Sequence, residues 1–409
     1  MCTPQSTMSE DDSIYRELDV TPVVNAAGTK TRIGGSRIRP GALDAMRRAA
    51  DEFVEIGDLE ARASTAIADV TGAEAGYVTS GASAGLLLCA AAAIVGRDVG
   101  VMNALPDTAD VPSEIVMPRT HRTGYDHAFR TAGATIVDVG TNDRHLGTGA
   151  TDVEPWQLDR AITDETVAVG YMQKSYTQPS LSSVVAVAHE NDVPVIVDAA
   201  AEVPPRENLS AFVETGADMV VFSGGKGIRG PQTTGFVAGK REYVASIAAQ
   251  HLDMHVANDL WDPPTDLIDR ERLDGVPRQG IGRPLKVGKE ELVGAIRALE
   301  LFVAEDHGQL EAGWIDLAEA MAERLAETGL GVHVTSPNGT SVAPEIVVDV
   351  EATGIGTNAT ELARTLRDED PRVYVGTDDL PDGEIVVNPM CLDQNEAEYV
   401  IDRIVANVE

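Results

Sequence analysis

The chain has 409 residues, 43% of them hydrophobic, which is enough for two domains or for one large domain with a smaller partner. Its formal net charge of −34 is spread along the whole sequence, a pattern typical of salt-in halophiles or of an ordinary acidic protein, and such a charge disfavours a nucleic-acid partner. The three cysteines have no paired spacing, the N-terminus is polar, and the longest apolar stretch (85–96) is too short to span a bilayer. We therefore predict a cytoplasmic protein without disulfides, bound metal or membrane anchor.

The first two thirds of the chain alternate between helical stretches and short apolar strands. Residues 20–50 form a Gly- and Arg-rich arm that runs into a helix starting near Pro40, and a second helix is expected over 57–71. Strands are expected at 75–79, 114–118, 135–140, 167–172, 193–199, 219–225 and 234–239. Val- and Ile-rich strands that alternate with helices predict a mostly parallel sheet covered by helices on both faces.

The last third of the sequence reads as a smaller α/β domain. A long amphipathic helix begins near residue 290. Four further strands are expected near 331–336, 344–350, 372–376 and 384–388. The expected organisation is an N-terminal arm (1–45), a large domain (46–285) and a small C-terminal domain (286–409).

The stretch "TSGASAGLLL" predicts a strand end, a turn of small residues and the start of a helix. This geometry directs backbone N–H groups and the positive end of the helix dipole into the turn, which suits a phosphate. Ser80, Gly81, Ala82 and Ser83 would form the cradle. The alternative is a purely structural turn, since neither the P-loop nor the dinucleotide spacing of glycines is present.

A carboxylate follows the apolar run "VPVIV". Asp198 would lie at the carboxyl end of a parallel strand, where ligands bind in open α/β sheets. The alternative role for this side chain is to cap the next helix.

One lysine is surrounded by glycines in "FSGGKGIRGPQ". Lysine is scarce here, with six residues against 26 arginines, and unlike arginine it can lose its proton and attack a carbonyl. We interpret the glycines around Lys226 as leaving room for a flat ring and for movement of the amine. A solvated surface lysine is the alternative, but it needs neither the glycines nor a preceding buried strand.

The three motifs together, in this order, are the arrangement expected for pyridoxal 5′-phosphate (PLP). Lys226, 28 residues after Asp198, would form the Schiff base with the cofactor. Asp198 would keep the pyridine nitrogen protonated, and Ser223 would join the cradle at 80–83 in holding the phosphate.

Five segments carry a resemblance to a known family: "VVNAAGTKTRIGGS", "TGAEAGYVTSGASAGL", "PRTHRTGYDHAFRTAGATIVDVG", "VDAAAEVPP" and "FSGGKGIRGPQTTGFVAGK". They resemble the selenocysteine synthase-related branch of fold-type-I PLP enzymes, and within it the D-glucosaminate-6-phosphate ammonia-lyase group. The resemblance covers roughly residues 20–300. It implies a large domain with a mostly parallel sheet, a small C-terminal α/β domain, and a homodimer or higher oligomer whose sites are completed by a neighbouring subunit.

The resemblance also implies a histidine on the face of the cofactor. His121 follows the strand at 114–118 and is the first candidate, with Tyr125 and His127 as alternatives. A histidine in an ordinary loop is the structural alternative.

Substrates of this family carry a carboxylate, which arginine binds well. Arg283 or Lys286 in "RQGIGRPLKVGKEE" is expected to hold it, unless this stretch is only a solvated basic hinge. Lys30 and Arg32 in the arm could reach the site of a partner subunit.

The favoured reaction is α,β-elimination of ammonia from a 2-amino-2-deoxy sugar acid, such as D-glucosaminate or its 6-phosphate, to give a 2-keto-3-deoxy acid. The first alternative is β-replacement or selenium or sulfur transfer on a seryl substrate. The family's selenocysteine synthases carry an extra N-terminal tRNA-binding region, whereas only about 20 residues precede the arm here, which counts against that alternative. A non-catalytic PLP-binding protein is the second alternative, and the presence of both Lys226 and Asp198 counts against it.

Overall fold

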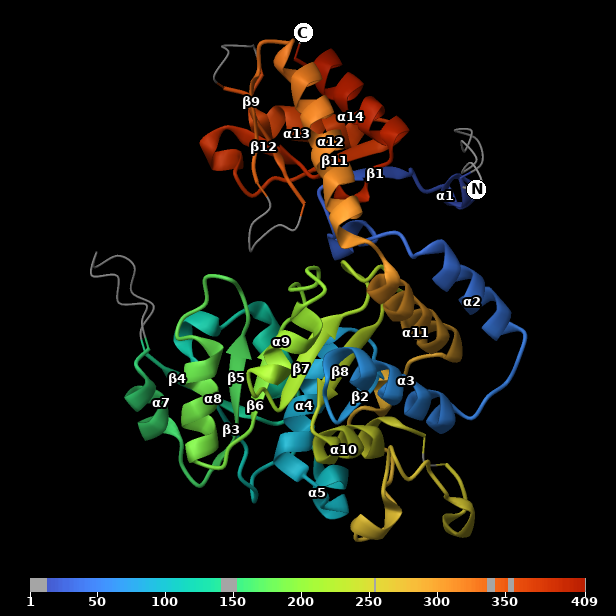
Figure 1. The fold of residues 1–409 in the computed structure, drawn as a ribbon, viewed down its shortest axis with the longest axis vertical. Helices are drawn as coiled ribbons and strands as arrows, with labels where there is room; N and C mark the ends of the chain where they lie inside the picture. Colours follow the sequence, from blue (N-terminus) through green and yellow to red (C-terminus); the bar gives the residue numbers. More distant parts are fainter. Residues whose placement is uncertain (1–12, 141–152, 254, 337–342, 352–356, 409) are drawn as a thin grey trace. The chain divides into compact units, whose positions relative to one another are not determined.

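The computed structural model describes residues 13–140, 153–253, 255–336, 343–351 and 357–408. They form two compact units, one of residues 37–305 and one that joins the N-terminal segment up to Ser36 with residues 306–409 (Figure 1). The larger unit ends after helix α11 (Lys289–Ala304), because α11 packs along α2 (Pro40–Ala50). The boundaries expected from sequence, at 45 and 285, would have divided α2 between the arm and the large domain and placed α11 outside the large domain.

A seven-stranded sheet forms the centre of the larger unit, in the order β2-β8-β7-β6-β5-β3-β4. The strands are β2 (Ala75–Thr79), β3 (Glu114–Pro118), β4 (Thr135–Val139), β5 (Thr166–Met172), β6 (Val195–Asp198), β7 (Met219–Ser223) and β8 (Gly235–Gly239). Only β8 runs antiparallel to its neighbours, β2 and β7, and every other pairing in this sheet is parallel. The predicted mostly parallel sheet is thus confirmed.

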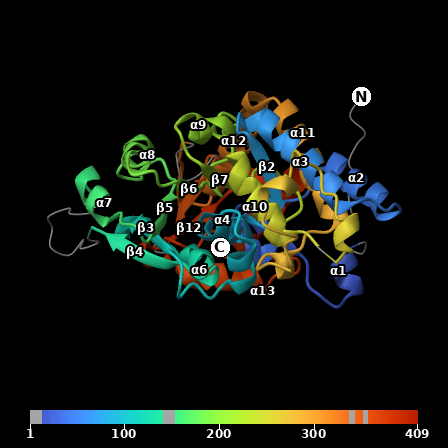
Figure 2. The ribbon, with the colours of Figure 1, turned by 90° about the horizontal axis from the view of Figure 1, so that it is seen from below.

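Helices cover both faces of this sheet, as Figure 2 shows for α8 and α9 on one side and α4 and α6 on the other. The first face is covered by α3 (Ile56–Thr71), α7 (Pro155–Ala161), α8 (Leu181–Glu190) and α9 (Asn208–Glu214), and the second by α4 (Ala82–Val95), α6 (His127–Thr131) and α10 (Arg241–His251). Side chains of β6 alternate between them, since Val195 and Val197 pack on the first face and Ile196 on the second. Two buried faces explain why the strands are apolar at nearly every position.

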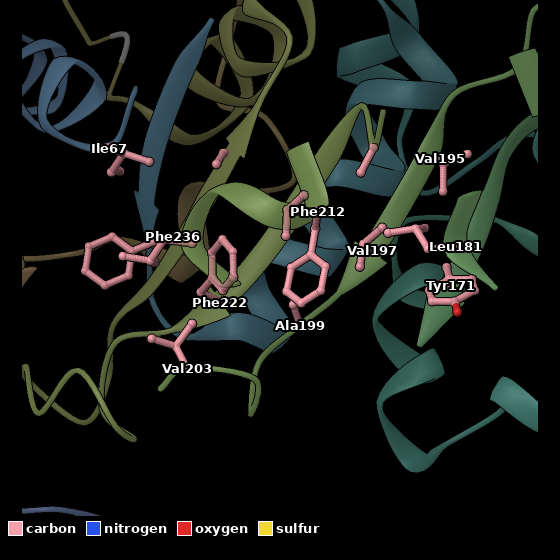
Figure 3. Packing of buried hydrophobic residues seen from close by; sticks show 14 of the residues in the cluster. Ile67, Tyr171, Leu181, Val195, Val197, Ala199, Val203, Phe212, Phe222 and Phe236 are labelled. Carbon is pink, nitrogen blue, oxygen red and sulfur yellow. The ribbon is translucent and has the colours of Figure 1, made fainter. Parts of the chain in front are cut away.

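Packing on the first face fixes the positions of β5, β6 and β7 (Figure 3). The ring of Phe212 from α9 stacks on that of Phe222 from β7, with centroids 6.3 Å apart. Each fully buried side chain of this size contributes about 1.5–3 kcal/mol to the free energy of unfolding. These contacts hold the strands side by side, and therefore hold their carboxyl ends at one edge of the sheet.

The smaller unit contains two short sheets and three long helices. Strands β9 (Gly331–Val334), β10 (Ile346–Asp349) and β12 (Glu384–Val387) form an antiparallel sheet, and β1 (Val23–Ala26) pairs in parallel with β11 (Arg372–Val375). The helices are α12 (His307–Ala326), α13 (Ala359–Asp368) and α14 (Gln394–Ala406). The four strands expected in this region are present, but the expected arm contributes β1 to this unit rather than remaining a separate segment.

Candidate active site

The residues singled out in the sequence follow strands whose carboxyl ends share one edge of the large sheet. Strands β2 and β7 are parallel to each other because both run antiparallel to β8, and β7 is parallel to β6. Ser80 therefore follows β2 at the same edge where Asp198 ends β6 and Ser223 ends β7. Lys226 comes three residues after β7. Ligands of open α/β sheets bind at this edge.

The turn between β2 and α4 has the form of an anion cradle. Helix α4 begins at Ala82, and the N–H groups of its first turn have no carbonyl partner within the helix. Gly81 has φ +103°, which favours glycine, and a Cβ atom on it would meet no atom within 4 Å, so the turn is open on this side. A Cβ atom on Gly235, at the start of β8, would lie 2.5 Å from the carbonyl carbon of Gly81. Glycine at position 235 therefore allows β8 to pack directly against the backbone of this turn.

Asp198 combines burial with positive charge. Its Oδ1 accepts a hydrogen bond of 3.1 Å from the N–H of Ala200. The pKa of this carboxyl is raised, because burial outweighs the hydrogen bond and the charges of Lys226 and Lys174, which lower it. The charge of Lys226 thus acts on Asp198 at the sheet edge, and the predicted roles of the two side chains at opposite ends of one ring stay a prediction.

The glycines around Lys226 do not have the function that the sequence suggested. A Cβ atom on Gly225 would lie 2.6 Å from the Cα atom of Gln232, and one on Gly227 would collide with the carbonyl oxygen of Val203. Both positions face protein atoms rather than open space, so the interpretation that these glycines clear a slot for a ring is wrong. They allow the loop to pack tightly, and this packing holds the half-buried Lys226 at the sheet edge.

His121 lies in a short 3-10 turn after β3, with only 1% of its surface exposed. Its Nε2 lies 2.9 Å from the carbonyl oxygen of Gln178, and its Nδ1 accepts a hydrogen bond of 3.4 Å from the N–H of Met172. Because Nδ1 accepts a hydrogen bond and Nε2 faces a carbonyl oxygen, the proton of the ring lies on Nε2, and burial lowers the pKa of the imidazole. Its edge-to-face contact with Tyr171 and its burial do not provide the open ring face that the predicted stacking role requires.

Two charged residues at this edge were missed in the sequence. Lys174 follows β5, and its Nζ lies 2.7 Å from Oε1 of Glu202, which is 8% exposed. The side chain of Asn208 donates a hydrogen bond of 2.6 Å to the carbonyl oxygen of Glu202. The scarcity of lysine and the position of Lys174 directly after a strand were the available signals, but a pairing across 28 residues was not visible in the pattern.

The basic residues expected to bind substrate are not part of this cluster. Arg283 lies near the C-terminal end of α10, where it forms an ion pair of 3.0 Å with Asp253. A Cβ atom on the neighbouring Gly282 would lie 2.6 Å from the side chain of Leu88 in α4, so this segment packs on the α4–α10 layer. Lys286 is exposed. In the described part of the chain, neither side chain contacts Asp198.

The two basic residues of the arm belong to the smaller unit. Lys30 forms an ion pair of 3.6 Å with Asp378, and Arg32 is exposed in a 3-10 turn. Their predicted contact with a site in a partner subunit stays a prediction.

The chemical groups at the sheet edge fit PLP. The open turn at Gly81 and the first turn of α4 suit its phosphate, Lys226 offers an amine for its aldehyde, and Asp198 offers a carboxylate for its pyridine nitrogen. Among the described residues, no three His, Cys, Asp or Glu side chains are arranged to hold a metal ion. None of the helices in the described ranges is long and apolar enough to cross a membrane.

Comparisons with known proteins agree with this architecture. Residues 125–253 match the family model for class-V aminotransferases. The chain is 32% identical to D-glucosaminate-6-phosphate ammonia lyase from Salmonella typhimurium, over 96% of this chain and 97% of the relative. It is 30% identical to 5′-C-glycyluridine monooxygenase-decarboxylase from a Streptomyces species, over 95% and 90%. It is 24% identical to L-seryl-tRNA(Sec) selenium transferase from Nitratidesulfovibrio vulgaris, over 74% and 60%.

The three-dimensional structure is also similar to that of a known lyase. A solved structure of D-glucosaminate-6-phosphate ammonia-lyase superimposes with a TM-score of 0.79 and 31% identity, over 97% of this chain and 99% of that one. The similarity extends over both compact units.

Proposed function

Because the chain belongs to the family of PLP-dependent enzymes that includes D-glucosaminate-6-phosphate ammonia lyase, we propose that it releases ammonia from a 2-amino-2-deoxy sugar acid. It has the fold-type-I architecture and uses PLP as its cofactor. The substrate we propose is D-glucosaminate or its 6-phosphate, and the products are a 2-keto-3-deoxy acid and ammonia. The observation that carries this proposal is the full-length identity of 32% to the lyase.

In this proposal, three groups of the chain hold the cofactor. Lys226 binds it through Nζ, Asp198 pairs with its pyridine nitrogen, and the turn at 80–83 binds its phosphate together with Ser223. When bound, PLP supplies an electron-accepting ring that stabilises negative charge on the α-carbon of an amino acid. The carboxylate of Asp198 supports this function because an ionised acid keeps the ring nitrogen protonated.

Lys226 also moves the proton in the elimination. Its free amine takes the proton from the α-carbon of the substrate, and the β-hydroxyl group leaves with a proton as water. The released enamine tautomerises to an imine, and hydrolysis of the imine consumes one water and gives the keto acid and ammonia. One water is lost and one is consumed, so the net reaction is deamination without oxidation.

Contacts to the substrate carboxylate are assigned in this proposal to a neighbouring subunit. Arg283 forms an ion pair with Asp253 beside α10, and in this proposal it reaches the site of a neighbouring subunit in a homodimer or a higher oligomer. The same holds for Lys286, which is exposed. Lys30 and Arg32 remain further candidates for these contacts.

A β-replacement on a seryl substrate is the second candidate, favoured by the 24% identity to L-seryl-tRNA(Sec) selenium transferase. This identity is lower and covers less of both chains than the match to the lyase. A non-catalytic PLP-binding protein is a weaker candidate, because Lys226 and Asp198 lie together at the sheet edge.

The test is a panel of substrates offered to the purified protein with PLP. D-glucosaminate, its 6-phosphate and their epimers are compared with serine and cysteine, and ammonia, 2-keto acid and dissolved oxygen are measured. We expect ammonia and keto acid in equal amounts from a sugar acid, without consumption of oxygen. Turnover of serine or cysteine alone would favour the β-replacement enzyme. Oxygen uptake with release of carbon dioxide would indicate a reaction like that named for the Streptomyces relative.

A further inference from the structure

Hydrogen bonds fasten the loop that carries Lys226 to the segment before α2. The N–H of Arg39 donates to the carbonyl oxygen of Arg229 at 2.9 Å, and its Nε donates to that of Ile228 at 2.8 Å. In the other direction, Nε of Arg229 donates to the carbonyl oxygen of Arg37 at 3.2 Å. These bonds join two segments that lie almost 190 residues apart in the sequence.

The side chain of Arg39 is buried at a position where a helix favours another kind of residue. Only 7% of the surface of Arg39 is exposed. The residue is the N-cap of α2, where a positive charge opposes the helix dipole, and its side chain makes no capping hydrogen bond. Arginine is seldom buried unless it is paired. The side chain of Arg39 therefore serves contacts outside its own helix.

The charge of Arg39 is balanced at the end of α11. Its Nη2 lies 2.8 Å from Oε2 of Glu305, and its guanidinium group lies over the ring of Phe302, 5.7 Å from the ring centroid. The same planar group thus binds the Lys226 loop through Nε and the end of α11 through Nη2. Since Arg39 and Glu305 lie near the two ends of the larger unit, residues 37–305, their ion pair joins these ends.

Backbone hydrogen bonds within the loop connect these contacts to Lys226. The N–H of Arg229 donates to the carbonyl oxygen of Lys226 at 3.0 Å, and the N–H of Gly230 donates to that of Gly224 at 2.8 Å. Arg229 has φ +58°, a conformation that residues with a side chain adopt rarely and keep only where their surroundings hold them. We propose that Arg39 is a positioning residue for Lys226, which holds the loop in the form that presents the lysine amine to the aldehyde of the cofactor.

The inference rests on the proposed function in one respect, that Lys226 is the lysine that bonds to PLP. In the same proposal, Asp198 and the turn at 80–83 hold the ring and the phosphate. Among the described residues, Arg39 forms no hydrogen bond or ion pair with either of them. Loss of Arg39 should therefore affect the bond to Lys226 and leave the other contacts with the cofactor unchanged.

The experiment compares two forms of the cofactor on the full-length protein from which PLP has been removed. PLP bonds to the lysine amine through its aldehyde with loss of one water, whereas pyridoxamine 5′-phosphate has an amine in place of the aldehyde and binds without such a bond. Fluorescence titration gives both dissociation constants. Arg39→Met is expected to weaken PLP binding about tenfold, the effect of losing one hydrogen bond from a charged group, and to leave pyridoxamine 5′-phosphate binding unchanged.

Arg241→Met is the matched control. Arg241 also joins two segments through backbone carbonyls, since it donates to the oxygens of Asp266 at 2.6 Å and Glu74 at 2.8 Å. It begins α10 after β8 has run from the turn at Gly81 to the opposite edge of the sheet. Its replacement should lower the melting temperature without a change in the ratio of the two dissociation constants.

Equal weakening of both cofactor forms in Arg39→Met would show a structural role alone and would overturn the proposal, as would unchanged PLP binding. If Arg39→Met does not fold, Arg39→Lys decides in the same way. This variant keeps the charge opposite Glu305 but lacks the Nε–H that reaches Ile228, so a smaller loss of PLP affinity alone is expected. The readout involves no sugar acid, so failure of the proposed substrate is distinguishable from failure of this inference.

Discussion

Two carboxyl groups of the larger unit, those of Asp198 and Glu60, lie in opposite electrostatic situations. Asp198 lies at the sheet edge under the charges of two lysines, whereas Glu60 lies in α3 against the first face of the sheet, fully buried. Burial raises the pKa of both. At Glu60 the opposing influence is one hydrogen bond of 3.2 Å from the N–H of Val78 to Oε2, and among the described residues Oε1 has no partner.

The difference between the two carboxyl groups lies in the charged groups that oppose the effect of burial. Burial favours the neutral acid, and it raises the pKa of Glu60 well above the ordinary value of a glutamic acid. At Asp198 the charges of two lysines oppose part of the effect of burial, so its pKa is raised less than burial alone would raise it. A buried acid with nearby cations is therefore a better indicator of a functional site than a buried acid as such.

The largest effect on turnover is expected from the removal of Lys226, whose amine would both bind the cofactor and act as the base. Lys226→Ala should lower turnover by at least about 10³-fold, because it removes both the covalent attachment and the base. Wild-type protein treated with borohydride should carry the pyridoxyl group on the peptide that contains Lys226, as read by mass spectrometry. A pyridoxyl group on any of the other five lysines would contradict the assignment.

The next effect separates the two carboxyls directly. Asp198→Asn should lower turnover by about 10²–10⁴-fold at saturating PLP, because an unprotonated pyridine accepts electrons poorly. Glu60→Gln is the matched control, since it makes the same change of acid to amide in the same unit, and its turnover should be unchanged. Near-normal turnover of Asp198→Asn would mean that this carboxyl serves only the local backbone, through Ala200.

The salt dependence of the melting temperature should depend on the exposed carboxylates and not on Asp198 or Glu60. With a net charge of −34, exposed carboxylates repel one another, and salt reduces the screening length from about 10 Å at 0.1 M to about 3 Å at 1 M. We expect the melting temperature to rise by about 5 °C or more between these conditions. Asp198→Asn and Glu60→Gln should show the same rise, because neither changes an exposed charge. A melting temperature independent of salt would contradict the prediction of a halophilic protein.

The smallest effect is the pH dependence that Glu60 adds to stability. Its pKa is raised in the folded state, so its contribution is fully present below the unfolded pKa of about 4.3 and is lost as pH rises toward the folded pKa. Over that window wild type should lose up to about 1.4 kcal/mol per pH unit relative to Glu60→Gln. Urea unfolding at several pH values measures the difference. A constant difference between the two proteins would show that Glu60 does not titrate on unfolding.

Local patterns in the sequence were enough to predict the sheet edge. Each motif is visible within about ten residues: an apolar run that ends in Asp198, an apolar run before Lys226, and a turn of small residues before α4. Parallel strands then bring the three motifs to one edge of the sheet. The reason for the glycines next to Lys226 was not predictable in this way. It depends on Gln232 and Val203, which approach the loop only in the folded chain.

Pairings between distant segments were also beyond the sequence pattern. The ion pair of Lys174 and Glu202 joins the ends of two strands, and charge alone does not specify which acid a lysine meets. Arg283 was expected near the substrate because it is basic, yet Asp253 binds it beside α10. The burial of His121 depends on Tyr171 and Gln178, which belong to a different strand and loop.

The pairing of β1 with β11 has a consequence for the order in which the protein is made. Val24 and Ala26 are synthesised more than 340 residues before Arg372–Val375, the strand that pairs with theirs. The larger unit, residues 37–305, is complete well before that point. During translation β1 therefore stays without its partner strand while more than 340 residues are synthesised. In that period its apolar side chains can bind chaperones or aggregate.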